Sequence, residues 1–127
     1  MTAARGVDPP LVLVVDDDPD ILEAICEILA GEGYRVARAR HGVEALAAMD
    51  RERPALVLLD LMMPVMDGVA FSEAMRGRER DRDVPIVIIS AEGNPQKAAG
   101  IGARAYLSKP FDIDALLAEV AGIAAGA

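Results

Sequence analysis

The segment Leu11-Val-Leu-Val-Val-Asp-Asp-Asp-Pro19 is the most informative part of the sequence. Its five apolar residues do not alternate with polar ones, which is typical of a strand buried on both faces of a parallel sheet. Asp18 can cap a helix, and Pro19 suits the first helical position. The stretch therefore predicts a buried strand that leads through three aspartates into a helix.

Strand and helix patterns then alternate along the chain. Two more apolar runs predict buried strands, Ala55–Leu59 and Ile86–Ile89, and two weaker strands fit at Tyr34–Ala39 and Ala103–Leu107. Helical patterns cover Pro19–Ala30, Val43–Met49, Val69–Arg76, the region near Pro95–Ile101, and Ile113–Ile123. Five alternations favour an α/β fold with a doubly wound, five-stranded parallel sheet and five helices.

Length and composition limit the possible functions. At 127 residues the chain has room for one domain, which we expect over residues 10–125 after a tail of residues 1–9. A net charge of −8 argues against binding nucleic acid through this domain. The single cysteine fits a reducing compartment, and no apolar run is long enough to cross a bilayer. We therefore expect a cytoplasmic protein with no membrane contact.

Three other features carry no predicted chemistry. The alternating charges of Arg76–Asp83 predict a solvated loop. His41 is expected to be an ordinary surface histidine. Cys26 lies near the apolar stripe of the first helix and is expected to be a buried small hydrophobe.

Chemically active side chains follow the predicted strands. Asp16 and Asp17 follow the first strand, Asp60 the third, Ser90 the fourth and Lys109 the fifth. In an open α/β sheet, ligands bind beyond the carboxyl ends of the strands, so these residues should meet at one edge. Lys109 is one of only two lysines among 13 basic residues, which favours a specific role for its compact ammonium group.

Clustered carboxylates at this edge would repel one another unless a cation lay between them. Mg²⁺ prefers oxygen ligands and also binds phosphate oxygens. A hydroxyl and an ammonium nearby suit the other oxygens of a phosphoryl group. An aspartate beside Mg²⁺ can itself be the nucleophile in phosphoryl transfer.

Four sequence blocks resemble the signature blocks of response-regulator receiver domains, the chemotaxis-regulator-like switches of two-component signalling. They are Leu13–Pro19, Leu58–Gly68, Ile88–Ala91 and Tyr106–Phe111, in the order of the family, within a resemblance that covers Pro10 to Ile123. The resemblance implies a flavodoxin-like sheet with strand order 2-1-3-4-5.

The resemblance also assigns a phosphoacceptor and a metal site. Asp60 would accept a phosphoryl group from a histidine kinase, a phosphotransfer protein or a small phosphodonor. Asp17, Asp60 and the backbone carbonyl of Met62 would bind Mg²⁺ directly, and Asp16 would act mainly through a bound water. No other cofactor is implied.

The remaining family residues form the switch. Ser90 would hydrogen-bond a phosphoryl oxygen and move toward it, Lys109 would pair with another oxygen, and Tyr106 would report the position of Ser90 to the surface. The Lys109–Pro110 peptide would be cis. Such a protein signals to a downstream partner by conformational change, and it catalyses only its own phosphorylation and dephosphorylation.

Three alternatives are weaker. A degenerate receiver could serve only as a docking scaffold, although every position that carries the chemistry is filled here. A phosphohydrolase of the haloacid-dehalogenase type would use Asp16 as its nucleophile, which leaves the Asp60 block unexplained. A flavin carrier with the same fold would need phosphate donors where this chain has carboxylates.

The segment from Ala91 to Gly102 is rich in helix breakers. We expect its helix, which begins at Pro95, to run about two turns and to be mobile before phosphorylation.

Overall fold

The computed structural model describes residues 9–61, 67–91, 96 and 100–126 of the chain. Its five strands are β1 (Leu11–Val15), β2 (Arg35–Ala39), β3 (Leu56–Leu59), β4 (Ile86–Ser90) and β5 (Ala105–Ser108). All pair in parallel in the order β2-β1-β3-β4-β5. The predicted doubly wound sheet and its strand order are confirmed.

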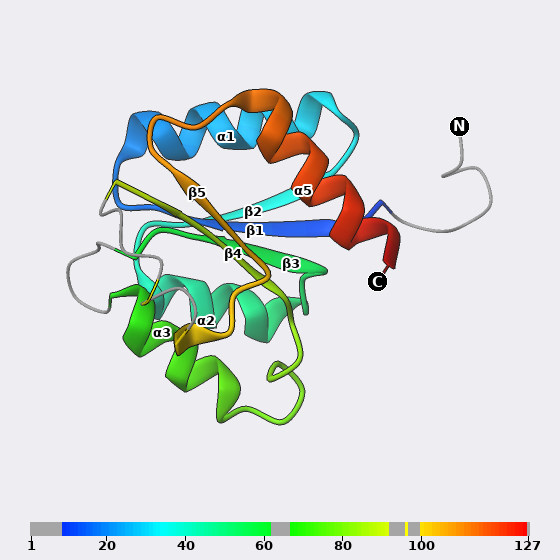
Figure 1. Ribbon diagram of the computed structural model, residues 1–127. Coiled ribbons are helices and arrows are strands. Elements are labelled where there is room, and N and C mark those ends of the chain that lie inside the picture. Colours follow the sequence, from blue (N-terminus) through cyan, green and yellow to red (C-terminus); the bar gives the residue numbers. More distant parts are fainter. Residues whose placement is uncertain (1–8, 62–66, 92–95, 97–99, 127) are drawn as a thin grey trace.

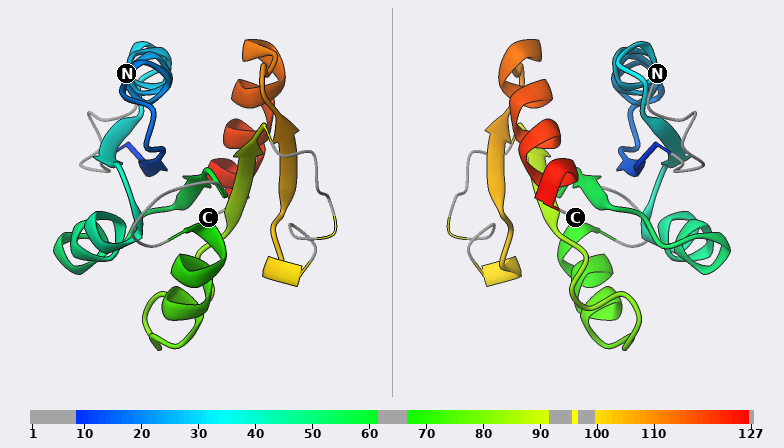
Figure 2. Two further views of the ribbon diagram at one scale, coloured as in Figure 1. Left: turned by 90° about the vertical axis from the view of Figure 1, so that its left-hand side faces the viewer. Right: turned by 90° about the vertical axis from the view of Figure 1, so that its right-hand side faces the viewer.

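Helices cover both faces of the sheet. The described residues form α1 (Pro19–Gly31), α2 (Gly42–Arg51), α3 (Gly68–Arg76) and α5 (Ile113–Gly126). Helices α1 and α5 lie on one face and α2 and α3 on the other (Figures 1 and 2). The described part thus has four helices where five were expected, because the segment near residues 95–101 lies largely outside it. The expected mobility of residues 91–102 falls mostly outside it too.

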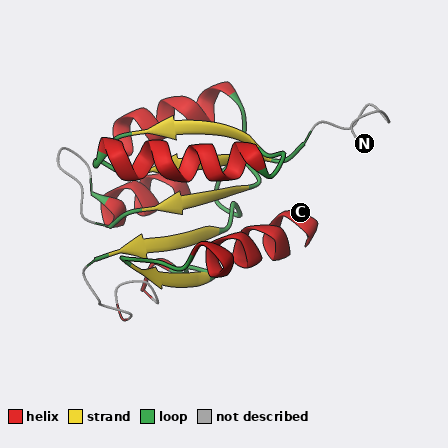
Figure 3. Cartoon of the chain, turned by 90° about the horizontal axis from the view of Figure 1, so that it is seen from above, coloured by secondary structure: helices red, strands yellow, loops and turns green. Residues whose placement is uncertain are grey.

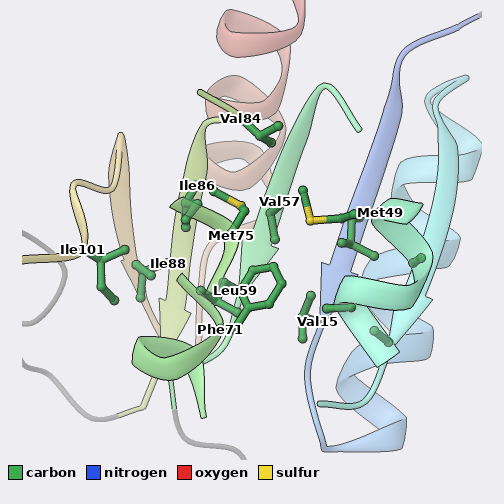
Figure 4. Packing of buried hydrophobic residues seen from close by; sticks show 14 of the residues in the cluster. Val15, Met49, Val57, Leu59, Phe71, Met75, Val84, Ile86, Ile88 and Ile101 are labelled. Carbon is green, nitrogen blue, oxygen red and sulfur yellow. The ribbon is translucent and has the colours of Figure 1, made fainter. Parts of the chain in front are cut away.

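The sheet is the centre of two apolar cores. Strands β1, β3 and β4 are buried along their whole length, as their unbroken apolar runs predict. On the α2/α3 face, Phe71 and Met75 of α3 pack with Leu59 and Ile88 of the sheet (Figure 4). On the other face, α1 and α5 contribute a second cluster that includes Cys26, which is 1% exposed as expected.

Local capping explains where two helices begin. The Asp18 carboxylate accepts hydrogen bonds from the backbone N–H of Asp20 at 2.9 Å and of Ile21 at 3.3 Å, which confirms the predicted cap. His41 caps α2, because its Nδ1 accepts a hydrogen bond from the Glu44 N–H at 3.3 Å. His41 is partly exposed, and besides lying at the surface as predicted it has this capping role.

The charged loop after α3 is not simply solvated, as its composition suggested. The Asp81 side chain is fully buried, and its Oδ2 lies 2.9 Å from Nε of Arg78. Arg78 also pairs with Asp50 at the end of α2, and Nη2 of Arg80 donates to the Met49 carbonyl at 3.0 Å. A buried carboxylate requires such partners, and they attach this loop to α2.

All five strands point the same way, so their carboxyl ends share one edge of the sheet (Figure 3). Across the described ranges, none of the helices has the length and apolar character needed to cross a membrane.

Candidate functional site

The carboxyl edge brings Asp16 and Asp60 together, because the strands that precede them are neighbours. The backbone N–H of Asp60 donates to the Val15 carbonyl at 2.9 Å, and that of Asp16 donates to the Ala39 carbonyl at 3.1 Å. These hydrogen bonds extend the sheet by one residue past β1 and β3, and they hold the backbone of Asp16 and Asp60 in place. Strand pairing therefore places the site.

Three carboxylates form one cluster. Asp16, Asp17 and Asp60 each offer a carboxylate oxygen within 4.8 Å of the other two. Asp16 is 2% exposed and Asp60 is 4% exposed, whereas Asp17 is open to solvent. Like charges this close, two of them shielded from water, repel strongly unless cations neutralise them.

Lys109 supplies one such cation. Its Nζ lies 2.8 Å from Oδ2 of Asp16 and 3.4 Å from Oδ2 of Asp60. Burial alone would lower the pKa of Lys109, but its hydrogen bond to Asp16 and the charges of Asp16 and Asp60 outweigh burial and raise the pKa. The ammonium group is thus held in its charged form between two carboxylates.

Backbone contacts place Lys109 at this point. It follows β5, its N–H donates to the Ser90 carbonyl at 3.0 Å, and the Lys109–Pro110 peptide is cis, as the family resemblance implied. Asp16 is also held on its other side, where Oδ1 accepts the Asp18 N–H at 2.9 Å. Both oxygens of Asp16 therefore already have partners.

Ser90 and Tyr106 lie on neighbouring strands of the same edge. Ser90 is the last residue of β4, is fully buried, and faces Ser108 across the β4–β5 ladder. Tyr106 pairs with Ile88 in that ladder and packs, half-buried, against the apolar cluster under α2 and α3. Ser90 is thus beside the strand that carries Asp60, and Tyr106 is two residues further back.

Gly68 is a site residue to which the sequence analysis gave no role. It is the first residue of α3, and its N–H donates to the Leu61 carbonyl at 3.1 Å. A Cβ atom at this position would lie 2.9 Å from the Asp60 carbonyl oxygen. The Asp-Gly pair at the start of a predicted helix was the available signal.

The donor set fits a hard divalent cation. Carboxylate oxygens are the preferred ligands of Mg²⁺, and a site that also admits water and phosphate oxygens suits it further. The three-carboxylate cluster, open to solvent on the Asp17 side, has this chemistry. The Met62 carbonyl, which was predicted to bind Mg²⁺ directly beside Asp17 and Asp60, lies outside the described residues.

Comparison with known proteins places the chain in a family. The family described as "Response regulator receiver domain" matches residues 12–121. The transcriptional regulatory protein PrrA of Mycobacterium tuberculosis is 43% identical over 118 residues, which cover 91% of this chain and 50% of PrrA. The DNA-binding regulator RpaA of Synechocystis is 39% identical over 87% of this chain and 47% of its own length.

Solved structures of response regulators and receiver domains have the same fold as this chain. A putative response regulator from Chloroflexus aurantiacus superposes with a TM-score of 0.86 at 32% identity, over 93% of this chain and 99% of that one. The chemotaxis regulator CheY4 of Vibrio cholerae gives a TM-score of 0.83 at 33% identity, over 91% and 98%. A receiver domain of a Pseudomonas aeruginosa sensor kinase, solved with magnesium in its active-site cleft, gives 0.84 at 29% identity, over 92% and 98%.

The chain spans about half the length of the curated relatives that it matches. The family match covers most of the chain, and the fold, the acidic cluster and the relatives agree with it. The chain belongs to the response-regulator receiver domains, the phosphorylation-dependent switches of two-component signalling.

Proposed function

We propose that Asp60 is the phosphoacceptor of a Mg²⁺-dependent switch. The observation that carries this proposal is the position of Lys109, whose Nζ lies between Asp60 and Asp16 within the three-carboxylate cluster. Asp16 already has a partner for each of its oxygens. Asp60 follows the central strand β3 and matches the phosphoacceptor position of the family, and this position favours Asp60 over Asp16 as the nucleophile.

The transfer step uses one carboxylate oxygen of Asp60. This oxygen forms a bond to the phosphorus atom while the bond from phosphorus to the donor breaks, which gives an acyl phosphate. With acetyl phosphate the leaving group is acetate, and with a phosphohistidine it is the imidazole nitrogen, which takes up a proton. Hydrolysis by water returns Asp60 and releases phosphate.

Asp16, Asp17 and Asp60 would hold Mg²⁺. When bound, the ion neutralises charge on the acids and on the phosphoryl oxygens that develop negative charge during transfer. Lys109 contributes a second positive charge that reaches both Asp16 and Asp60. Once Asp60 is phosphorylated, the Lys109 ammonium group would pair with one of the phosphoryl oxygens.

Ser90 and Tyr106 would carry the signal away from the site. The Ser90 hydroxyl would donate a hydrogen bond to a phosphoryl oxygen, and Tyr106 would respond because it lies on the adjoining strand. Tyr106 packs against the cluster that also contains Ile101, so its movement would reach the end of the segment before β5. This connection from Ser90 to Tyr106 and Ile101 supports a protein that signals by changing its surface, rather than one that converts an external substrate.

The partners follow from the family. A histidine kinase or a phosphotransfer protein would supply the phosphoryl group in the cytoplasm, and a downstream protein or another part of a longer chain would read the switch. The relatives PrrA and RpaA are named as a transcriptional and a DNA-binding regulator, and the chain matches about half of each. With a net charge of −8, this domain would not itself be the part that binds DNA.

Labelling of the purified protein by acetyl phosphate tests the proposal. We expect one phosphoryl group per chain in the presence of Mg²⁺ and none in the presence of EDTA, read by intact mass. Asp60→Asn should abolish the labelling, whereas the exposed control Glu27→Gln should leave it unchanged. Labelling of Asp60→Asn at the wild-type level would show that the assignment is wrong.

The same experiment separates the alternatives. A docking scaffold would not become labelled at all. An Asp16-dependent phosphohydrolase would lose labelling in Asp16→Asn and keep it in Asp60→Asn.

A further inference from the structure

A pocket lies at the amino ends of the strands, at the edge of the sheet opposite Asp60. It is bounded by residues just before β3, β4 and β5 and by Gly122 and Ile123 near the end of α5, and it has a volume of about 340 Å³. The strands run away from it toward the acidic edge (Figure 3). This volume is at the small end of the range for pockets that bind small molecules.

This pocket, which we call the basal pocket, is lined by both apolar and charged residues. Ala55, Pro85 and Ile123 give it an apolar lining. Arg53 and Arg104 bring two guanidinium groups, and Asp83 brings one carboxylate. All three charged residues are exposed, so they lie where a ligand entering from solvent would meet them.

The guanidinium groups retain donors for a ligand. Arg53 uses Nε to donate to the Arg80 carbonyl at 2.8 Å, which orients its side chain. For Arg104 and Asp83, the described part of the chain contains no side-chain hydrogen bond or ion pair. In a protein that pairs other arginines with carboxylates, such as Arg35 with Glu52, two arginines in one pocket stand out as an anion site.

Gly122 is the residue of the pocket lining that has no side chain. It lies inside α5, where glycine is less favourable than alanine, and a Cβ atom there would meet no atom within 4 Å. Packing therefore does not require a glycine at this position. Because Gly122 lines the pocket, we expect a large side chain at this position to take up part of its volume.

From these features we propose that the basal pocket binds a small organic carboxylate with an apolar body. The carboxylate would accept hydrogen bonds from Arg53 and Arg104, and the body would lie on Ala55, Pro85 and Ile123. Asp83 brings the charge of the lining residues to +1, which favours one carboxylate over a dianion such as phosphate. The carboxyl end of α5 adds partial negative charge, which likewise disfavours a dianion more than a single carboxylate.

NMR titration of the full chain with benzoate tests the proposal without Mg²⁺ or a phosphodonor, so the result does not depend on chemistry at Asp60. We expect saturable shifts of the Ala55, Gly122 and Ile123 amides. Benzyl alcohol, which has the ring without the charge, and inorganic phosphate, which has the charge without the ring, should each bind at least about fivefold more weakly.

Variants distinguish a site from a general attraction of anions. Arg104→Gln should weaken benzoate binding about tenfold, as expected for the loss of a charge-assisted hydrogen bond. The exposed control Arg40→Gln makes the same change in net charge outside the pocket and should leave binding unchanged. Gly122→Leu should abolish binding, and Gly122→Ala should retain part of it.

Several results would overturn the proposal. These are an absence of saturable shifts at the three amides, equal affinities of Arg104→Gln and Arg40→Gln, and full binding by Gly122→Leu. Thermal melting of each variant checks that it is folded. Because alanine and leucine favour helix over glycine, both Gly122 variants should melt no lower than the wild type.

Discussion

Gly68 packs directly against the backbone of Asp60. A Cβ atom on Gly68 would lie 2.9 Å from the Asp60 carbonyl oxygen and 2.8 Å from the Leu61 Cα atom. Both neighbours are backbone atoms, which cannot turn aside as the end of a flexible side chain can. The start of α3 therefore fixes the position of the residue that we propose as the phosphoacceptor.

Gly68→Ala should consequently impair both stability and phosphorylation. The added methyl group must push the Asp60–Leu61 backbone or α3 aside, at a cost of about 1–3 kcal/mol in the free energy of unfolding. A displaced Asp60 should also react about tenfold or more slowly with acetyl phosphate, because small misplacements of a nucleophile are costly. Urea unfolding and the initial labelling rate measure the two effects.

Gly77→Ala is the matched control for this substitution. Gly77 follows the same helix, has φ of −77°, and the nearest atom to an added Cβ is at 3.6 Å. We expect unchanged labelling and a gain of about 0.4–1 kcal/mol in stability. If Gly68→Ala behaved like Gly77→Ala, the close contact would have no role in placing Asp60.

Mg²⁺ should stabilise the folded protein through the acidic cluster. At free Mg²⁺ about tenfold above its Kd, binding to the native state alone adds roughly 1.4 kcal/mol, which raises the Tm by a few degrees. Asp17→Ala should remove this shift, whereas Glu27→Ala, an exposed acid outside the cluster, should keep it. Equal shifts in both variants would place the Mg²⁺ effect elsewhere on this acidic chain.

The fold and the acidic edge could be predicted because both depend on local sequence. An unbroken apolar run such as Leu11–Val15 is typical of a strand in a covered parallel sheet, and the residue after such a strand lies at the carboxyl edge. Asp16, Asp17, Asp60 and Lys109 meet in one cluster for that reason. Asp18 could be predicted as a cap because its partners are two and three residues away.

The features that could not be predicted from the sequence depend on contacts between distant segments. Asp81 stands in a run of alternating charges, and nothing in that run indicates that Arg78 beside it also reaches Asp50 on α2. The closeness of Gly68 to Asp60 likewise depends on how the segment between β3 and α3 returns to the sheet. Local composition does not contain either distance.

Asp81 and Asp50, which both pair with Arg78, should differ in their contribution to stability. Asp81 has no exposed surface, whereas the Asp50 side chain is 67% exposed, although both pair with the same guanidinium. Asp81→Asn should cost about 2–4 kcal/mol, because it breaks a buried ion pair. Asp50→Asn should cost less than about 1 kcal/mol, as surface pairs do. Urea unfolding of both variants provides the comparison, and similar costs would mean that burial does not set the strength of this network.

Cys26 should make the protein less stable at alkaline pH. Burial raises the pKa of its thiol, and Glu23 adds to this, while the nearby Arg38 charge opposes it. Because the folded-state pKa exceeds that of the unfolded chain, the native state holds the proton more tightly. Stability is therefore complete below the ordinary thiol pKa of about 8.5 and falls as the pH rises toward the folded-state value.

The loss should reach at most about 1.4 kcal/mol between pH 7.5 and 9.5, since each pH unit above the unfolded pKa costs no more than this. Urea unfolding at the two pH values measures it. Cys26→Ala lacks the thiol but keeps every other titrating group, so the difference between its pH dependence and that of the wild type isolates the contribution of Cys26. The wild type should lose more stability than Cys26→Ala over this interval. Identical losses would mean that the thiol ionises as readily in the folded protein as in the unfolded chain, which its 1% exposure should prevent.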